Sequence, residues 1–401
     1  MLFLDVTSSC KSAKNTGMQR MTRKIFLELA KRVPTTPICW NLPGRRYQSL
    51  GPRERDVMER PFRVLPRPTA RPELRGENFV AELGRFVSRR RIRLETELGL
   101  GDVLLIPDLF RDGRMRILPR LISKSAARSV AIFHDAAALR LPLLYSGAQP
   151  RFQAYIEALA AFDLVVCISN ESRDELHRLW RQYKTKGTET CVELWPVEFP
   201  LRERQALSEN QRNLIVCVGS FEPRKNHLTL LRAAETLWRQ GLTFELELIG
   251  RSTRYYGHKI ISELKRLQKQ RRAICWSKHI DDQALHRAHR DCRFSVYPSL
   301  IEGFGLPIVE SLWHGKPCIC GGNGALGEVA RGGGCLVVDQ TSEDAIAAGI
   351  KKLLTDQEVY LRLGAEARAR KFHSWSHYTQ KLLEHLQLAP QDSTIAVTLK
   401  A

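Results

Sequence analysis

The chain has 401 residues, more than a single hydrophobic core usually serves, so we expect two domains. Hydrophobic residues make up 43% of it, an ordinary share for a globular protein, and its apolar runs are far shorter than the ~20 residues that a membrane-spanning helix needs. The formal net charge of +20 favours anionic partners; no RNP, zinc-finger or clear helix-turn-helix signature is present, so an anionic membrane surface is a better candidate than nucleic acid.

Short β-rich runs alternate with amphipathic stretches of helical length through the first half of the chain. The pattern predicts strands at 2–6, 38–42, 103–107, 130–134, 164–169 and 191–196. It predicts helices at 18–31, 151–162 and 171–183. The segment 43–98, rich in Pro and Arg, interrupts this order, and we expect loops and a helix there on the surface of the first half.

The N-terminal apolar run is expected to be the first strand. No charged segment precedes it, as one would in a signal peptide. We therefore expect the protein in the cytoplasm, at the inner face of the membrane where its basic surface meets anionic lipid.

The second half repeats the alternation. Strands are expected at 214–219, 244–250, 273–277, 294–298, 317–320 and 335–339. Helices are expected at 227–240, 257–270, 282–290, 307–314 and 342–355. This order predicts an α/β protein of two Rossmann-like domains with parallel sheets facing across a cleft: residues 1–200, a polar linker at 201–213, and residues 214–372.

The segment 298–310, PSLIEGFGLPIVE, carries the strongest chemical signal. Ligands of parallel sheets bind beyond the carboxyl ends of the strands, where this segment begins. Its glycines let backbone N–H groups approach a ligand, and the helix N-terminus that follows favours a phosphate. Glu302 and Glu310 could accept hydrogen bonds from the adjacent hydroxyls of a sugar or ribose. The alternative is that Glu310 only complements the helix dipole and Glu302 is a loop charge.

A second motif follows the strand at 214–219. Arg224 and Lys225 stand at a strand-to-helix turn that is expected to face the same sheet edge. Two cations beside a helix N-terminus can hold a pyrophosphate and offset the charge that grows on it as it leaves. Taken alone, such a pair is more often simply solvated.

Two further positions lie after strands of the first half. His134, followed by Asp135, is placed to meet a substrate, with Asp135 orienting it or capping a turn; a structural histidine is the alternative. Gly17, in the segment Asn15–Arg20, could bring backbone donors to a phosphate, and this signal is weak by itself.

The cysteines do not indicate a metal site. Of 10 cysteines, several lie in apolar strand-like runs and none forms a Cys-x-x-Cys pair, so buried reduced thiols are expected. No Asp-x-Asp occurs either, and we expect no metal and no other cofactor.

These motifs together resemble those of GT-B glycosyltransferases of family GT4. The segment from Glu302 to Glu310 has the E-x7-E form of that family, and EPRKN at 222–226, HD at 134–135, TGMQR at 16–20, ISNES at 168–172 and GALGEV at 324–329 are similar to its other motifs. The stretch that begins at Trp375 resembles its last helix, so residues 373–388 are expected to cross back to the first domain, followed by a tail at 389–401. The chain departs from the family at Ser220, where many members carry Arg.

The resemblance implies a retaining, metal-independent transferase that uses a nucleoside diphosphate sugar. Arg224 and Lys225 would hold the diphosphate, Glu310 the ribose, Glu302 the sugar hydroxyls, and Gly303, Phe304, Gly305 and Leu306 would form the loop around the donor. His134 would support the transferred sugar, and Gly17 would approach the phosphate. Similarity to polysaccharide mannosyl- and rhamnosyltransferases implies a hexose or deoxyhexose donor, GDP-mannose first, and a surface polysaccharide or lipid-linked glycan as acceptor.

Three other functions fit parts of the sequence. A NAD(P)-dependent dehydrogenase would use the G-x-G-x-x-G of 322–327, but glycines at 332–334 end the following helix too early for a dinucleotide site. A sugar-nucleotide epimerase or hydrolase would keep the fold and change the reaction, whereas a glycan phosphorylase needs a pyridoxal lysine and a longer chain. A non-catalytic binder is the remaining alternative.

Overall fold

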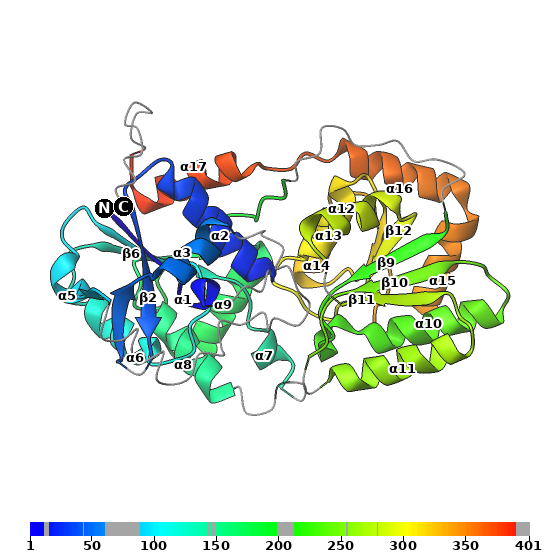
Figure 1. Ribbon diagram of the computed structural model, residues 1–401, viewed down its shortest axis with the longest axis horizontal. Helices are drawn as coiled ribbons and strands as arrows, with labels where there is room; N and C mark the ends of the chain where they lie inside the picture. The colour runs from blue at the N-terminus through cyan, green and yellow to red at the C-terminus, as the bar shows by residue number, and fades with distance from the viewer. Residues whose placement is uncertain are drawn as a thin grey trace. The chain divides into compact units, whose positions relative to one another are not determined.

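The computed structural model describes residues 1–11, 16–42, 44–60, 89–142, 145, 149–198, 212–253, 256–278 and 280–389. The chain divides into two compact units. Unit 1 comprises Met1–Leu139, Gly147–Pro196 and His373–Ala401, and unit 2 comprises Arg140–Ser146 and Val197–Phe372. Each unit contains its own largely parallel sheet, as the alternation of strands and helices predicts (Figure 1).

The sheet of unit 1 has eight strands. In spatial order they are β4 (Arg91–Ile92), β3 (Arg46–Ser49), β2 (Thr35–Asn41), β1 (Leu2–Asp5), β5 (Val103–Ile106), β6 (Arg128–Phe133), β7 (Leu164–Cys167) and β8 (Glu189–Val192). The helices are α1 (Thr7–Cys10), α2 (Gly17–Ala30), α3 (Pro52–Glu59), α5 (Leu94–Glu97), α6 (Arg114–Ile122), α7 (Ala137–Arg140), α8 (Gln149–Leu159), α9 (Asn170–Gln182) and α17 (Trp375–Leu386).

The segment 43–98 corrects two expectations. It adds β3 and β4 to the sheet as well as helices α3 and α5. β3 pairs antiparallel with β2 and β4 pairs antiparallel with β3, so this sheet is mixed rather than wholly parallel. A short turn returns the chain beside β2, because Asn41 Oδ1 accepts a hydrogen bond from the Gly44 N–H at 2.8 Å. Across the two strands Trp40 packs edge-on against Tyr47, with ring centroids 5.2 Å apart. The part of this segment at 61–88 lies outside the described residues.

The expectation for 191–196 is also wrong in its bounds. β8 ends at Val192 because β7, its partner, ends at Cys167, which pairs with Val192. The other expected strands and helices are present within a few residues of their predicted ends, whereas α6 and α16 (Gln357–Ala369) were not predicted.

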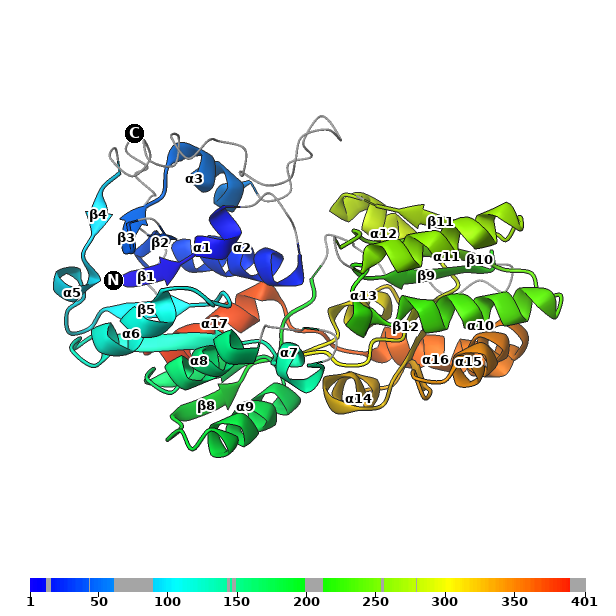
Figure 2. The same ribbon diagram turned by 90° about the horizontal axis from the view of Figure 1, so that it is seen from below.

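The last helix belongs to unit 1. α17 packs against α2, and both views show the red C-terminal helix beside the blue N-terminal one (Figures 1 and 2). Arg32, just after α2, donates to the Ser376 hydroxyl at 2.8 Å, and His385 Nε2 lies 2.8 Å from Glu193 Oε1 beyond β8. The C-terminal segment therefore returns to the first unit.

The sheet of unit 2 is parallel and has six strands. Its order is β11 (Ile274–Ser277), β10 (Glu245–Ile249), β9 (Leu214–Val218), β12 (Phe294–Tyr297), β13 (Cys318–Cys320) and β14 (Cys335–Val337). Its helical segments are η1 (Pro223–Lys225), α10 (His227–Arg239), α11 (Gly257–Lys269), α12 (Asp282–Asp291), α13 (Leu306–Trp313), α14 (Gly324–Ala330), α15 (Glu343–Thr355) and α16.

Helices cover both faces of this second sheet (Figure 1). On one face α10, α11 and α15 bury a continuous apolar core that includes Leu230, Leu264 and Ile350. On the other, α12 packs over Val216 and Ile249. Each fully buried leucine or isoleucine of this core stabilises the unit by roughly 1.5–3 kcal/mol. Because helices cover both faces of the sheet, only the strand ends remain available for a ligand.

Candidate functional site

The candidate site lies where the strand order of unit 2 reverses. β9 is the first strand of this sheet; β10 lies on one side of it and β12 on the other. At such a point the segments after the two central strands diverge, which leaves a place for a ligand beyond their carboxyl ends. The segments that follow β9 and β12 are the two that the sequence singles out.

Three charged side chains from these segments meet in what we call the charged triad: Arg224, Lys225 and Glu302. Glu302 Oε2 lies 2.6 Å from Arg224 Nη1, and its Oε1 lies 2.7 Å from Lys225 Nζ. Lys225 also donates to the Tyr297 hydroxyl, and the Ser299 hydroxyl donates to Glu302 Oε1. The structure thus brings these three predicted site residues together.

The charges of the triad are set by burial and by one another. Burial opposes ionisation of Glu302, but the charges of Arg224 and Lys225 outweigh it and hold the pKa of this carboxyl at about 2. Burial and the neighbouring Arg224 lower the pKa of Lys225, while Glu302 acts against both. Glu222 also lies 3.2 Å from Arg224 Nε, so the two cationic donors stand beside two carboxylates, and an anionic ligand can bind the donors in place of these carboxylates.

The backbone around the triad is shaped by two left-handed residues. Asn226, directly after η1, has a φ of 54° and lets the chain turn into α10. Gly305, with a φ of 96°, is the residue before α13, and Pro307 stands in the first turn of that helix. The N-termini of α10 and α13 therefore begin next to the residues of the triad in the chain, and each adds about half a positive charge.

The remaining predicted residues of this segment lie at the start of α13. Gly303, Phe304 and Gly305 are buried, and Leu306, half-buried, opens the helix. Glu310 lies one turn further on and is only 2% exposed. Glu310 is thus a buried acid in the second turn of the helix that follows the triad segment.

Ser220, where many GT4 members carry Arg, has a different role in this chain. Its hydroxyl donates to Glu222 Oε1 at 2.6 Å, and Glu222 Oε2 lies 3.2 Å from Arg224 Nε. Ser220 therefore acts on Arg224 through Glu222. The sequence reasoning missed these contacts, as it missed Tyr297 and Ser299, because hydroxyl groups carry no motif of their own.

His134 lies in unit 1, directly after β6. Its Nε2 is 2.6 Å from the Pro107 carbonyl oxygen, so Nε2 carries the hydrogen and donates. Burial lowers the pKa of His134, although the Pro107 carbonyl and Asp135 act in the opposite direction. The ring is therefore neutral, packs edge-on against Trp195, and leaves Nδ1 as a buried acceptor with no hydrogen-bond partner among the described residues.

Asp135 caps a turn and does not orient His134. Its Oδ1 accepts a hydrogen bond from the Ala137 N–H at 3.0 Å, at the start of α7. Of the two roles that the sequence left open, the structure shows the cap.

Gly17 is the first residue of α2, also in unit 1. The preceding Thr16 N–H donates to Gln19 Oε1 at 3.3 Å, which satisfies one backbone donor of the helix start. Asn15, the first residue of the same motif, lies outside the described residues. Gly17 and His134 thus belong to unit 1, whereas the other predicted site residues belong to unit 2.

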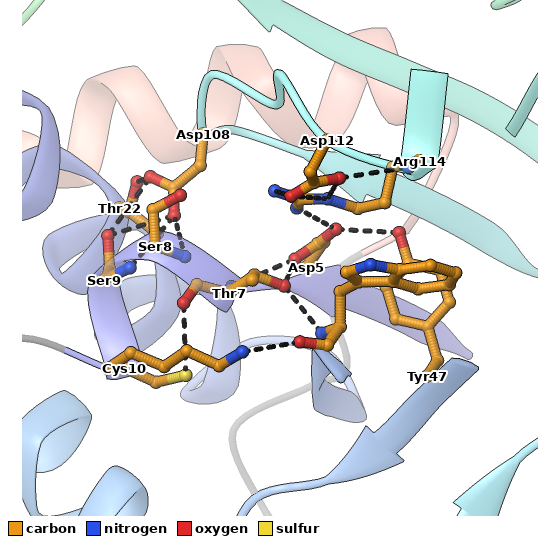
Figure 3. A network of polar contacts seen from close by, with 12 residues as sticks. Asp5, Thr7, Ser8, Ser9, Cys10, Thr22, Tyr47, Asp108, Asp112 and Arg114 are labelled. Carbon is orange, nitrogen blue, oxygen red and sulfur yellow. Dashed lines mark hydrogen bonds and ion pairs between the residues drawn. The ribbon is translucent and has the colours of Figure 1, made fainter. Parts of the chain in front are cut away.

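A buried carboxylate that sequence reasoning did not single out fixes the start of α2. Asp108, after β5, accepts hydrogen bonds from the Ser8 and Ser9 N–H groups at 3.2 Å and from the Thr22 hydroxyl at 2.6 Å (Figure 3). Burial raises the pKa of Asp108 to about 6, although its hydrogen bonds act against this. Because Thr22 stands on α2, Asp108 holds the helix that begins with Gly17.

A second buried carboxylate holds the neighbouring strand ends. Asp5, at the end of β1, lies 2.8 Å from Arg114 Nη1 and accepts a hydrogen bond from the Tyr47 hydroxyl at 2.8 Å (Figure 3). Arg114 in turn pairs with Asp112 at 2.9 Å. The two carboxylates therefore link the carboxyl edge of this sheet through buried hydrogen bonds and ion pairs.

Two features that would change the chemistry are absent from the part of the chain that the structure describes. Among the described residues no group of three or more His, Cys, Asp or Glu side chains is placed to hold a metal ion. In the same part of the chain, no helix has the length and apolar character needed to cross a membrane.

The glycine-rich turn of 322–327 does not lead into a crossover helix. α14 has 7 residues, about two turns. Gly327 lies against the backbone of Gly322, since a Cβ added at position 327 would lie 2.1 Å from the Gly322 carbonyl oxygen. A dinucleotide site needs a full helix after this turn, so the geometry argues against the dehydrogenase alternative.

Comparison with known proteins agrees with the motifs. Residues 200–370 match the family model described as glycosyl transferases group 1. The O-antigen chain mannosyltransferase B of Escherichia coli is 28% identical over 273 residues, 65% of this chain and 70% of that protein. The serotype-specific mannosyltransferase WbdA of Escherichia coli is 24% identical over 340 residues, 79% of this chain but only 37% of that protein.

A shorter match joins the chain to a mycobacterial protein. The GDP-mannose-dependent alpha-(1-6)-phosphatidylinositol monomannoside mannosyltransferase of Mycolicibacterium smegmatis is 27% identical over 191 residues, 45% of this chain and 48% of that protein.

Solved structures share the fold over nearly the whole chain. HepE of Anabaena, determined in complex with UDP, has a TM-score of 0.65 at 16% identity and covers 96% of this chain and 99% of its own. Sucrose-phosphate synthase of Thermosynechococcus elongatus has a TM-score of 0.67 at 16% identity, and the match covers 96% of this chain and 98% of that one. At this identity the likeness establishes the two-domain α/β fold alone.

Proposed function

Because the chain is a GT4-type glycosyltransferase with the GT-B fold, we propose that it transfers a hexose or deoxyhexose, with retention, from a nucleoside diphosphate sugar to a glycan acceptor. The first donor to test is GDP-mannose, and the acceptor is a surface polysaccharide or a lipid-linked glycan. The mannosyltransferase names of the relatives support the sugar, and the GDP-mannose-dependent relative supports the base.

The charged triad carries this proposal. Arg224 and Lys225 converge on one carboxylate at the strand-order reversal of unit 2 and present two cationic donors there. A diphosphate that binds here meets two cationic donors and two helix N-termini. These are the groups that offset the negative charge of a departing nucleoside diphosphate.

The chemistry assigned to the site needs no protein nucleophile. The acceptor hydroxyl attacks the anomeric carbon on the face from which the diphosphate leaves, the glycosidic C–O bond to phosphate breaks, and the hydroxyl proton passes to a phosphate oxygen. Arg224 and Lys225 stabilise the leaving group, Glu302 holds sugar hydroxyls, and Glu310 holds the ribose. His134 accepts a hydrogen bond from the transferred sugar at its Nδ1.

In this proposal the first half of the chain binds the acceptor. The net charge of +20 favours an anionic or lipid-linked acceptor and loose attachment to an anionic membrane surface. Nucleic acid is not proposed as a partner, and no cofactor or metal ion is proposed to take part.

The test is a thermal-shift panel of GDP-, UDP-, dTDP- and ADP-sugars, followed by a transfer assay with and without EDTA. A bound donor raises the apparent stability, by about 2.7 kcal/mol when its concentration is 100 times Kd. We expect GDP-mannose to give the largest shift and transfer to continue in EDTA. If no nucleotide sugar shifts the transition, or if the donor is only isomerised or hydrolysed, the proposal is wrong.

A further inference from the structure

Three side-chain amides connect the segments that surround the charged triad. Asn226, the residue after η1, donates from Nδ2 to the Gln340 carbonyl oxygen at 2.7 Å. Gln340, beyond β14, donates from Nε2 to Asn323 Oδ1 at 2.8 Å. Asn323, beyond β13, donates from Nδ2 to the Leu300 carbonyl oxygen at 3.0 Å. We call this set of bonds the amide ring.

The ring closes through Arg224, which lies on the same segment as Asn226. The Leu300 N–H donates to the Arg224 carbonyl oxygen at 2.8 Å, and Arg224 is two residues before Asn226 in the chain. The Ser299 hydroxyl donates to the same Arg224 carbonyl at 3.1 Å. The segments that follow β9, β12, β13 and β14 are therefore joined in one hydrogen-bonded circuit.

Local features fix the orientation of the amides. The Thr229 hydroxyl donates to Asn226 Oδ1 at 2.6 Å, which leaves Nδ2 of Asn226 to donate into the ring. Gly321 makes room for Gln340, because a Cβ at position 321 would lie 2.3 Å from Gln340 Oε1. Gln340 itself is buried at 7% exposure, whereas its partner Asn323 is exposed.

The position of the ring in the chain relates it to the charged triad. Arg224 and Lys225 immediately precede Asn226, and Glu302 is two residues after Leu300. The bonds of the ring therefore fix how the segment that carries both cations lies against the segment that carries the carboxylate. A group held in place before the ligand arrives gives more binding free energy than one that must be ordered on binding.

We propose that Asn226, Gln340 and Asn323 are positioning residues, which hold Arg224 and Lys225 in the geometry that a donor diphosphate requires. This inference rests on the proposed function of the triad as the diphosphate site and adds residues that do not touch the donor. A positioning role differs from fold stabilisation in one measurable way: loss of the ring weakens ligand binding and leaves the stability of the ligand-free fold unchanged.

Asn323 is the position at which the two roles can be separated. It is exposed and precedes α14, but its side chain makes no bond that caps that helix. Replacing it with Ala removes two bonds of the ring without creating a cavity. A polar substitution at an exposed position usually changes the stability of the fold only slightly.

Asn213 gives the matched control. It is also an exposed Asn whose Nδ2 donates to a backbone carbonyl, that of Thr243 at 3.3 Å. It stands before β9, at the opposite end of the strand from the charged triad. Asn213→Ala therefore removes the same kind of bond in the same unit without touching the ring.

The experiment measures the affinity of the full chain for GDP and UDP by calorimetry, together with its thermal midpoint without ligand. For Asn323→Ala we expect about tenfold weaker binding of the preferred diphosphate, because Arg224 and Lys225 would then have to be ordered when the ligand binds. Its ligand-free midpoint should equal that of wild type. Asn213→Ala should bind like wild type. The double variant Asn323→Ala, Gln340→Ala should bind like Asn323→Ala alone, because both changes break the same link.

Two results would overturn the inference while leaving the proposed function intact. One is equal affinity in Asn323→Ala and Asn213→Ala. The other is a weakened affinity that comes with a matching loss of ligand-free stability, which would make the ring a structural element only. If wild type binds neither diphosphate, the proposed donor site is wrong and the inference that rests on it is wrong as well.

Discussion

The Glu302 carboxylate holds the Lys225 ammonium group at 2.7 Å, and neither side chain is more than 10% exposed. An ion pair this deeply placed contributes little to fold stability, because desolvation of the two charges offsets most of their attraction. Arg224 shares the same carboxylate at 2.6 Å. The arrangement is best explained as a site that keeps two cations ready for an anionic ligand, and the following predictions depend on it.

Lys225→Ala should lower the turnover of the donor by at least tenfold. The change removes one charge-assisted hydrogen bond to the diphosphate, which is worth about 1.5–3 kcal/mol. Glu302 keeps its contact with Arg224, so the fold should persist. The measurement is kcat/KM for the nucleotide sugar, with Lys352→Ala as control. Lys352 pairs with Asp356 on a helix surface at 3.0 Å. Wild-type activity in Lys225→Ala would contradict the assignment.

Glu302→Gln should separate binding from transfer. The variant removes one of the two carboxylates beside Arg224 and Lys225 and so makes the site more positive by one charge. We expect the nucleoside diphosphate to bind more tightly, by about tenfold or less at physiological salt. Transfer should become at least tenfold slower, because Gln replaces one of the two acceptor oxygens of the carboxylate with an NH2 group, which can only donate. A decrease in both quantities would show that Glu302 supports the phosphate site instead.

His134→Ala should reduce kcat and leave the affinity for GDP within twofold of wild type. His134 belongs to unit 1 and is assigned to the transferred sugar, whereas the diphosphate residues belong to unit 2. Loss of one hydrogen bond to the reacting sugar should cost about tenfold in rate. His177→Ala is the control, since His177 is another histidine of unit 1, whose Nε2 lies 2.8 Å from the Thr190 hydroxyl. Equal effects of both changes would remove His134 from the site.

The stability of unit 2 should fall as the pH is lowered from 7 to 5. Burial lowers the pKa of His314 to about 3, assisted by the nearby His289, His286, Lys316 and Arg290. The ring of His289 stacks on that of His314 at 5.5 Å. A histidine whose pKa is lower in the folded state takes up a proton on unfolding, so its stabilisation is complete above pH 6.5 and decreases below it. At pH 5 this single group should cost about 2 kcal/mol relative to pH 7.

The thermal midpoint measured across this pH range checks the histidine prediction. His314→Asn should flatten the pH dependence of the midpoint, whatever its effect at pH 7. His258→Gln, at an exposed position of α11, should leave the slope unchanged. An identical slope in wild type and His314→Asn would show that other groups control acid stability.

Attachment to vesicles should depend on charge. With a net charge of +20, the protein should sediment with anionic vesicles at low salt and less at physiological salt, where the Debye length is about 8 Å. Neutral vesicles serve as the control. Sedimentation that salt does not change, or none at low salt, would contradict an electrostatic membrane surface.

The long periodic segments made the fold predictable. Elements such as β9 and α10 can be recognised from the hydrophobic pattern of their own residues. The alternating order of strands and helices then indicates parallel sheets. β3 and β4 were missed because they are four and two residues long and are stabilised by neighbours distant in sequence. The pairing of Tyr47 with Trp40 exists only after the chain has turned back on itself.

The candidate site could be predicted in part for the same reason. Residues after strands, such as Lys225 and Glu302, are marked by their position at the sheet edge. That one carboxylate would bind both cations is a matter of side-chain geometry, which spacing does not determine. Asp5 and Asp108 were overlooked because their partners come from helices and strands up to about 100 residues away.

The most direct test of the central claim is a crystal structure of the protein with GDP-mannose bound. Our account predicts that the pyrophosphate contacts Arg224 and Lys225, and that sugar and ribose hydroxyls contact Glu302 and Glu310. A donor bound elsewhere, with the charged triad still closed on itself, would contradict the account.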